Sequence, residues 1–278
     1  MSRGANERPD VATAAATAPA PALIPADWIV PDWPAPATVR AFVTTRSGGF
    51  SRGPWGAGAA GGMNVGFGSG DSPDCVARNR ALLEACVPAP PRWLDLQHGA
   101  EVVVAEQIGS EPAAADASTA ITPEVVCCVT VADCLPVLLA DRSGSVVAAA
   151  HAGWRGLAAG VLQATVRAMH RRAGASIGQI DAFFGPSIGP AAFEVGEEVL
   201  HAMQRTLPQA QSAFAALPNG KFLADLPALA RQALAQVDVR SVSGGNWCTM
   251  SERERFFSFR RDRITGRHAA VIWLQRLV

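Results

Sequence analysis

Four short segments rich in valine follow one another between residues 101 and 151, and they limit the possible folds more than any other feature. They read EVVVAEQ, VVCCVTVAD, LPVLLAD and SVVAAAH. Each is bounded by Gly, Pro or Asp, which is typical of strands in a buried sheet. No helical pattern separates them, whereas the strands of a doubly wound parallel sheet alternate with helices. The run therefore argues against a doubly wound fold.

Elsewhere the chain alternates helical and extended patterns. Residues 154–172 carry apolar side chains at helical spacing and a basic last turn, which predicts one long helix. A helix is also predicted over residues 74–85, with Val76, Leu82 and Leu83 toward the core. Further strands are predicted at 37–46, 180–186 and 268–275, and helices at 193–204 and 227–236. The predicted fold class is α+β, a layered sandwich of mixed β-sheets flanked by helices.

The start of the chain differs in composition from the rest. Residues 1–25 are rich in Ala and Pro and lack the Leu/Val-rich centre of a signal peptide, which predicts a disordered tail. Residues 26–278 are expected to form a single domain. Inside it, a glycine-rich loop over residues 47–71 lacks the glycine spacing of a P-loop or a Rossmann motif.

Charge and cysteine content narrow the function classes. The 24 basic residues balance the 24 acidic ones, so no overall field attracts nucleic acid or an anionic membrane. Six cysteines form no CxxC pair, which favours a reducing cytoplasm. No apolar stretch reaches the roughly 18 residues that cross a bilayer. A small molecule is therefore the expected partner, with neither nucleic acid nor a membrane involved.

Three residues that can ligate a metal fall at turns beside predicted strands. His151 ends a strand just before a helix, Cys134 lies in the break between two strands, and His98 precedes a third. Two imidazoles and a thiolate suit zinc, and three protein ligands leave a fourth position open for water or substrate. Spacing alone leaves alternatives open: Cys134 is a metal ligand, a nucleophile or a buried small hydrophobe, and each histidine is a ligand or a structural side chain.

Several longer motifs resemble a known bacterial family. They are TTRSGGFSRGPWG at 44–56, MNVGFGSGD at 63–71, VARNRALL at 76–83, TVADCLPVLLAD at 130–141, HAGWRG at 151–156, FGPSIGPAAFEVGEEV at 184–199 and CTMSERERFFSFRRDRITGRHAAVIWL at 248–274. The chain resembles, from residue 40 onward, the purine nucleoside phosphorylase and peptidoglycan editing factor family, formerly described as laccase-like multicopper polyphenol oxidoreductases. HAGWRG together with ADCxP is a specific pair.

The resemblance carries a site and a fold with it. It implies that His98, Cys134 and His151 form a zinc site, with copper as an alternative metal, and that all three are catalytic. It also implies a fold similar to the catalytic domain of the cytotoxic necrotising factor. One departure is visible: the family pattern near the first histidine resembles WLxQVHG, whereas this chain has WLDLQHG, with Leu96 and Gln97 in place of Gln and Val. A polar contact behind the ligand is therefore in question.

The resemblance implies a zinc-dependent purine nucleoside phosphorylase, acting as a monomer on adenosine, inosine and methylthioadenosine, with adenosine deamination as a second activity and a role in peptidoglycan editing. Residues 26–278 are then a single catalytic domain. One alternative is a Cys/His hydrolase of a peptidoglycan precursor, and another is a non-enzymatic partner-binding protein. A copper-dependent polyphenol oxidase is a third, but five histidines and no HxH motif argue against a trinuclear copper cluster.

Phosphorolysis needs groups that hold the phosphate and the ribose. Cationic side chains must neutralise the phosphate beside the anomeric carbon. The candidates are Arg46 at a strand end, Arg155 at a helix start, and Arg260 or Arg261 in FFSFRRD. Asn64 in the glycine-rich loop is the candidate for a ribose hydroxyl or a base edge. The alternatives are surface arginines and a turn-forming asparagine.

Overall fold

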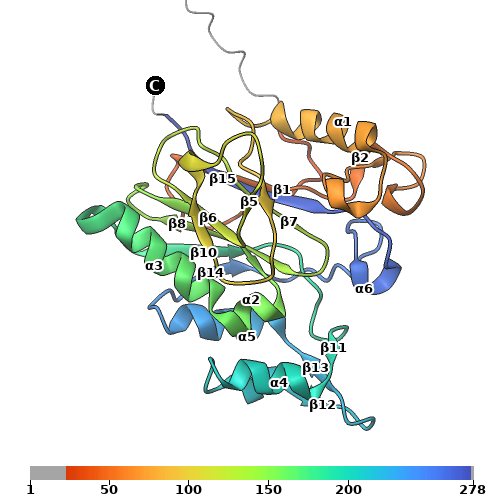
Figure 1. Cartoon of the computed structure of the whole chain (residues 1–278), viewed down its shortest axis with the longest axis vertical. Helices are drawn as coiled ribbons and strands as arrows, with labels where there is room; N and C mark the ends of the chain where they lie inside the picture. The colour runs from red at the N-terminus through yellow and green to blue at the C-terminus, as the bar shows by residue number, and fades with distance from the viewer. Residues whose placement is uncertain (1–22, 277–278) are drawn as a thin grey trace, which may run out of the picture.

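The computed structural model describes residues 23–276, so residues 1–22 of the predicted tail lie outside the described part of the chain. Two β-sheets pack face to face at the centre, and helices cover their outer faces (Figure 1). The predicted α+β class, with several sheets and flanking helices, is confirmed in this layering.

The larger sheet has six strands of mixed direction. In spatial order they are β14 (Ser241–Gly244), β10 (Ile180–Phe184), β8 (Leu135–Asp141), β9 (Val147–Ala152), β6 (Ala117–Ala120) and β4 (Val102–Val104). The three inner pairings are antiparallel, and the two edge pairings are parallel. Three of the four valine-rich segments lie here. The short strand β6 has no apolar run in its sequence, and the periodicity did not predict it.

The second sheet is antiparallel, with β15 (His268–Leu274) between β1 (Val39–Val43) and β7 (Cys127–Val131). Because side chains alternate along a strand, β8 contributes to both apolar layers. Leu135, Val137 and Leu139 pack under the helices, whereas Leu138 and Ala140 face the second sheet. Burial on both faces explains why this strand reads as an unbroken apolar run.

Three helices cover the larger sheet: α2 (Trp154–Ala159), α3 (Val161–Ala173) and α5 (Leu226–Ala235). The prediction of one long helix over 154–172 is wrong. Gly160 has φ of 85°, a left-handed conformation that ends α2 and starts α3 at an angle to it. The predicted basic last turn of α3 is present in His170, Arg171 and Arg172.

Helix α1 (Pro73–Glu84) covers the outer face of the second sheet, where Leu83 joins the apolar layer of Phe42 and Val271. Its predicted core face was partly wrong. Val76 and Leu83 are buried, but Leu82 is 38% exposed and Asn79 is fully buried. Asn79 takes the inner position because its amide binds the backbone of the glycine-rich loop.

The remaining elements are short. They are β2 (Ser47–Ser51), β3 (Leu94–Asp95), β5 (Ala113–Ala114), β11 (Glu194–Val195), β12 (Phe214–Ala216), β13 (Phe222–Ala224), α4 (Glu197–Gln204), α6 (Phe259–Asp262) and five 3-10 turns. The predicted helix over 193–204 thus begins with a strand, and its helical part forms a lower lobe with β11 to β13 (Figure 1). Among the described residues, no helix has the length and apolar character needed to span a membrane.

Candidate metal centre

Cys134 and His151 meet because β8 and β9 form one antiparallel hairpin. The register pairs Leu135 with Ala152 and Pro136 with His151, so the residue before β8 lies beside the end of β9. Gly153 permits this approach, since a Cβ built on it would lie 2.9 Å from Cys134 Sγ. A residue with a side chain would therefore push the thiol away from the imidazole.

His98 reaches the same place from the turn between β3 and β4. Its φ is 58°, in the left-handed region that non-glycine residues rarely adopt. The rings of His98 and His151 are nearly perpendicular, with centroids 4.8 Å apart. Within the described chain, His98, Cys134 and His151 are the group of His, Cys and acidic side chains suited to hold a metal, with all ligand atoms within 4.8 Å of one another.

These three side chains fit a metal ion by chemistry and by spacing. Tetrahedral bonds of about 2.0–2.3 Å place ligand atoms roughly 3.3–3.8 Å apart, so a small side-chain rotation closes the cluster. His151 is buried, Cys134 is half-buried and His98 is exposed, so the cluster opens to solvent on the His98 side. The donor set accepts zinc or copper alike.

The charges of Cys134 and His151 favour the thiolate, which is the form of Cys134 that ligates a metal. Burial by itself raises the pKa of Cys134, but the positive charge and hydrogen bond of His151, with a hydrogen bond from His98, outweigh it and lower that pKa. Burial lowers the pKa of His151, whereas the Cys134 charge and the Asp116 contact raise it by more. The thiolate is therefore the favoured form of Cys134, which both a metal and a nucleophilic mechanism need.

Asp116, just before β6, contacts both histidines and was not predicted. Its carboxylate is completely buried and lies 2.9 Å from His151 Nδ1. It also accepts the backbone N–H groups of His98 and Gly99. An aspartate in AAADAS carries no sequence signal for this role, because only the pairing of β6 with β9 brings it to the site.

Asp133, which precedes Cys134, ties the site to the C-terminal segment. Its carboxylate accepts the Thr249 hydroxyl at 2.5 Å and the backbone N–H of Arg260 at 2.6 Å. Arg267 faces the same turn: burial lowers its pKa, and the negative charges of Cys134 and Asp133 partly offset that effect. Sequence reasoning did not select Arg267, although it lies in the quoted motif ITGRHAA.

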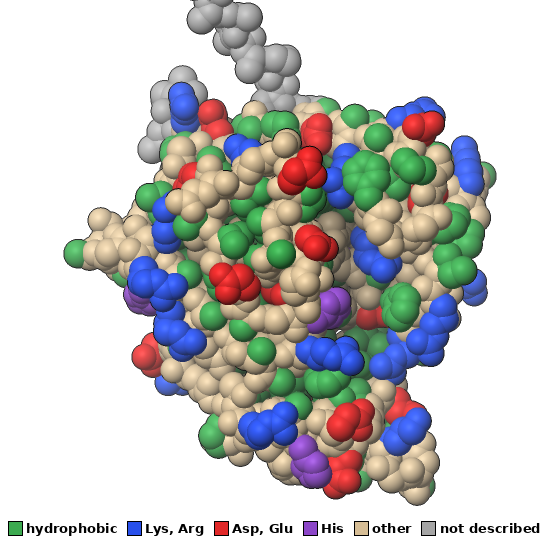
Figure 2. Space-filling model, viewed as in Figure 1, with side chains coloured by type: hydrophobic (Ala, Val, Ile, Leu, Met, Phe, Trp, Pro, Cys, Tyr) green, Lys and Arg blue, Asp and Glu red, His purple; other side chains and the backbone are tan. Residues whose placement is uncertain are grey.

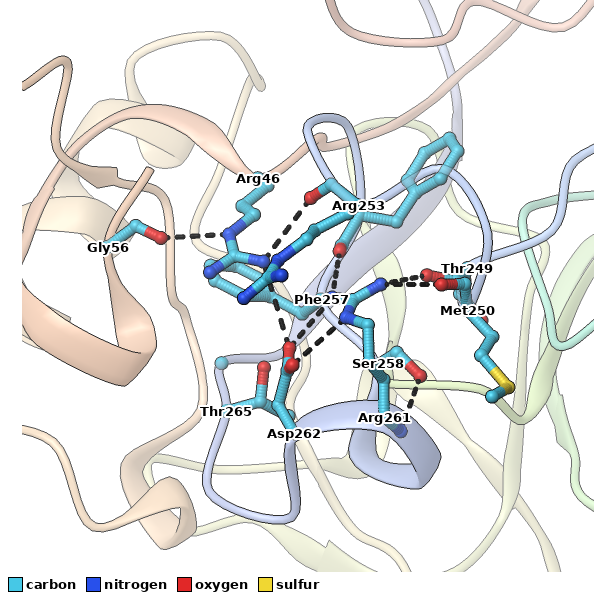
Figure 3. Close-up of polar contacts among 12 residues, drawn as sticks. Arg46, Gly56, Thr249, Met250, Arg253, Phe257, Ser258, Arg261, Asp262 and Thr265 are labelled. Carbon is cyan, nitrogen blue, oxygen red and sulfur yellow. Dashed lines mark hydrogen bonds and ion pairs between the residues drawn. The ribbon is translucent and has the colours of Figure 1, made fainter. Parts of the chain in front are cut away.

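Arg46 lies in a polar network that joins the glycine-rich loop to the C-terminal segment (Figure 3). Its Nε donates to the carbonyl of Gly56 at 2.8 Å, and one terminal nitrogen lies 3.8 Å from the Asp262 carboxylate. Arg261 binds Asp262 at 2.7 Å and also donates to the carbonyls of Thr249, Met250 and Phe256. Both guanidinium groups thus hold protein groups together.

The other predicted substrate residues differ in their freedom to bind a ligand. Asn64 is buried, its Nδ2 donates to Ser69 and Asp71, and its Oδ1 accepts the backbone N–H groups of Gly66 and Arg267. Its amide is therefore committed to the loop.

Arg260 and Arg155 complete the predicted set. One terminal nitrogen of Arg260 donates to the carbonyl of Glu194 at 2.8 Å, while its backbone N–H donates to the carboxylate of Asp133. Arg155 is exposed on α2, two residues after Gly153, and its guanidinium stacks on Trp154. The space-filling view shows a histidine with basic, acidic and apolar side chains around a hollow near the middle of the visible face (Figure 2).

The altered WLDLQHG segment leaves the first histidine in place. Gln97 is exposed, and its side-chain amide donates to the carbonyl and carboxylate of Asp95. Asp116 gives His98 a polar contact, since its carboxylate accepts the His98 backbone N–H at 2.8 Å.

Comparison with known proteins gives consistent matches along the chain. A family model described as multi-copper polyphenol oxidoreductase laccase matches residues 40–275. A purine nucleoside phosphorylase of Pseudomonas aeruginosa is 48% identical over 249 residues, covering 89% of this chain and 98% of that protein. The purine nucleoside phosphorylase YfiH of Escherichia coli is 48% identical over 252 residues, covering 88% of this chain and 98% of that protein.

A solved structure agrees with these matches. The crystal structure of protein NMB0706 of Neisseria meningitidis has a TM-score of 0.83 and 45% identity, covering 90% of this chain and all of that chain. On sequence and on structure, the chain belongs to the multi-copper polyphenol oxidoreductase laccase family, whose relatives in Pseudomonas and Escherichia are named purine nucleoside phosphorylases.

Proposed function

We propose that this protein is a zinc-dependent purine nucleoside phosphorylase acting on adenosine, inosine and methylthioadenosine, with deamination of adenosine as a second activity. The observation that carries the proposal is the cluster of His98, Cys134 and His151, which opens to solvent beside the exposed His98. The names of the relatives at 48% identity support the nucleoside chemistry. A metal bound there polarises an oxygen or activates water.

The reaction requires a phosphate oxygen to form a bond to the ribose anomeric carbon as the bond to the purine nitrogen breaks. The protein's part is to orient the phosphate and to neutralise its charge. Among the proposed phosphate ligands, Arg155 is the most available because it is exposed and stacks on Trp154. Arg46 and Arg260 are proposed to add positive charge at the edge of the phosphate site. Asn64 is proposed to hold the glycine-rich loop in place beside the ribose.

A nucleoside assay tests this proposal. Zinc-loaded protein given adenosine and phosphate is expected to release adenine and ribose 1-phosphate, and inosine where deamination occurs. His151→Ala is expected to abolish product release. His170→Ala is the matched control, because His170 is an exposed histidine in the last turn of α3. Absence of both adenine and inosine from the wild-type protein contradicts the proposal.

A Cys/His hydrolase of a peptidoglycan precursor is the second candidate. The specific observation in its favour is the contact of Cys134 with His151, which lowers the pKa of the thiol as in an activated nucleophile. The expected similarity to the cytotoxic necrotising factor domain belongs to this candidate. Activity that survives a chelator and is lost in Cys134→Ser favours the hydrolase, whereas loss of activity in both cases favours the metal enzyme.

A copper-dependent polyphenol oxidase is the third candidate. The cluster could supply ligands for one copper ion, but the family description names a multicopper enzyme. The chain has five histidines, and two of them, His98 and His151, lie in the cluster. A multicopper oxidase needs a further group of copper ions, mostly bound by imidazole. Oxidation of a phenol by copper-loaded protein, with no nucleoside activity for any metal, is the result that supports this alternative.

A further inference from the structure

Asp116 is the feature of the site that the proposed reaction does not use. It lies between the His98 turn and β9, immediately before β6, and no part of it is exposed. Its backbone is fixed first: the N–H donates to the carbonyl of Glu101 at 3.0 Å, and the carbonyl accepts the N–H of His151 at 2.7 Å. The carboxylate therefore has a defined direction toward the two histidines.

The two carboxylate oxygens of Asp116 have separate partners. Oδ1 accepts the backbone N–H of His98 at 2.8 Å and lies 2.9 Å from Nδ1 of His151. Oδ2 accepts the backbone N–H of Gly99 at 2.7 Å. One side chain thus contacts the ring of one candidate ligand and the backbone of another.

The contact with His151 selects one form of its ring. An ionised carboxylate accepts hydrogen bonds and donates none, so Nδ1 of His151 carries the proton. In the neutral ring, which is the form that ligates a metal, the lone pair is then on Nε2, the nitrogen on the other side of the ring. Asp116 thereby presents Nε2 of His151 as the ligand atom.

The contact with His98 acts on the backbone. His98 has φ of 58°, a conformation that is unfavourable for a residue with a side chain. Two successive N–H groups, those of His98 and Gly99, converge on the same carboxylate and stabilise this turn. Without the carboxylate the turn is free to relax, and the His98 ring then moves away from the cluster.

We infer that Asp116 is the positioning residue of the metal centre, which fixes the ligand nitrogen of His151 and the turn of His98 through one buried carboxylate. This inference shares one assumption with the proposed function, which is that a metal binds at the cluster. It makes Asp116 a determinant of metal affinity whatever reaction follows.

Zinc affinity measured by competition with a chromophoric chelator tests the inference. In Asp116→Asn the side chain has one acceptor oxygen and one NH₂ group, so either His151 Nδ1 or the Gly99 N–H loses its acceptor. Removal of a carboxylate behind a metal-bound histidine weakens metal binding by about 10–100-fold, and that range is expected here. A Kd within about threefold of the wild-type value overturns the inference.

Asp141→Asn is the matched control. Asp141 is also completely buried and also accepts backbone N–H groups, those of Ser143, Ser145 and Gly178, but it lies at the far end of β8 from Cys134. Its substitution is expected to leave the Kd for zinc within about threefold of the wild-type value. If Asp141→Asn weakens zinc binding as much as Asp116→Asn, the effect is general destabilisation and the inference is wrong.

A measurement on the unmodified chain keeps the test valid even if Asp116→Asn does not fold. Protein with ¹⁵N-labelled histidine and bound ¹¹³Cd is expected to show cadmium coupling to Nε2 of His151, whereas coupling to Nδ1 overturns the inference. Neither readout needs nucleoside turnover. Normal zinc binding without phosphorolysis therefore contradicts the proposed function and leaves the role of Asp116 intact.

Discussion

Replacement of Asn79 by alanine is expected to destabilise the protein by about 3 kcal/mol, because one buried amide holds the glycine-rich loop on α1. Nδ2 of Asn79 donates to Ser51 Oγ at 3.0 Å, to the Gly62 carbonyl at 3.1 Å and to the Asn64 carbonyl at 2.7 Å. Its Oδ1 accepts the N–H of Phe50 at 2.8 Å. Four groups of the loop therefore depend on one side chain.

The magnitude follows from the number of hydrogens on the amide. Nδ2 has two N–H groups for three acceptors, so the side chain of Asn79 makes about three full hydrogen bonds, two donated and one accepted. Each contributes about 0.5–1.5 kcal/mol net, which gives about 1.5–4.5 kcal/mol and a central value near 3 kcal/mol. With a urea slope of about 3 kcal/mol per molar, the unfolding midpoint falls by about 1 M.

Equilibrium urea unfolding at 25 °C checks this value, with two further variants. Asn219→Ala is the matched control, because Asn219 is exposed and accepts a single local N–H, that of Lys221; a change of at most about 0.5 kcal/mol is expected there. Asn79→Asp keeps the shape but turns a donor into a charged acceptor facing two carbonyl oxygens, so it is expected to destabilise more than alanine does. A loss below about 1 kcal/mol in Asn79→Ala, or the reverse order of the two Asn79 variants, refutes the hydrogen-bond reasoning.

Three other predictions concern the proposed zinc binding, the buried carboxylate of Asp141 and the proposed phosphate contact of Arg155. Zinc at 100 times its Kd stabilises the folded state by about 2.7 kcal/mol, so a chelator is expected to lower the unfolding temperature by about 5–10 °C in calorimetry, with no zinc response in Cys134→Ala. Asp141→Asn is expected to lower the free energy of unfolding by about 2 kcal/mol at pH 7. Burial alone raises the pKa of Asp141, but hydrogen bonds from the Ser143 and Ser145 hydroxyls outweigh it and lower that pKa. The stability that the ionised Asp141 confers is therefore present above the unfolded pKa of about 3.9 and is lost as the pH falls through the lower folded pKa. In urea titrations, the difference in unfolding free energy between Asp141→Asn and wild type is expected to close below about pH 4. A difference that widens in acid contradicts this prediction. Arg155→Ala is expected to raise the KM for phosphate about tenfold or more and to change the free energy of unfolding by at most about 0.5 kcal/mol, and an unchanged KM in steady-state kinetics removes Arg155 from the phosphate site.

Local patterns predicted the layers of this fold well where a segment's environment is uniform. β8 is apolar along its whole length because both of its faces are covered, and the sequence LPVLLAD shows this directly. The predictions failed where one residue altered the geometry. Gly160 divides the helix predicted over 154–172, because its left-handed backbone cannot continue a right-handed helix. The spacing of apolar residues is unchanged by a single glycine, so the helical pattern does not predict this break.

Asn79 and Leu82 show a second kind of failure. Hydrophobicity alone places Leu82 inside and Asn79 outside, but the surface that α1 covers includes a loop with free backbone groups. A buried polar side chain is favourable when it satisfies such groups, and the need for it is visible only when loop and helix are placed together.

The sequence by itself determined the residue types of the candidate metal centre and their positions at strand ends, because thiolate and imidazole chemistry belongs to single residues. The tertiary structure decided which of them meet. The register of β8 with β9 sets Cys134 beside His151, and the pairing of β6 with β9 brings in Asp116, which no local pattern marks. It also separated the arginines, leaving Arg155 exposed while Arg46 and Arg261 bind protein groups. A contact between residues distant in the chain depends on strand pairing and register, and those are properties of the whole packed fold.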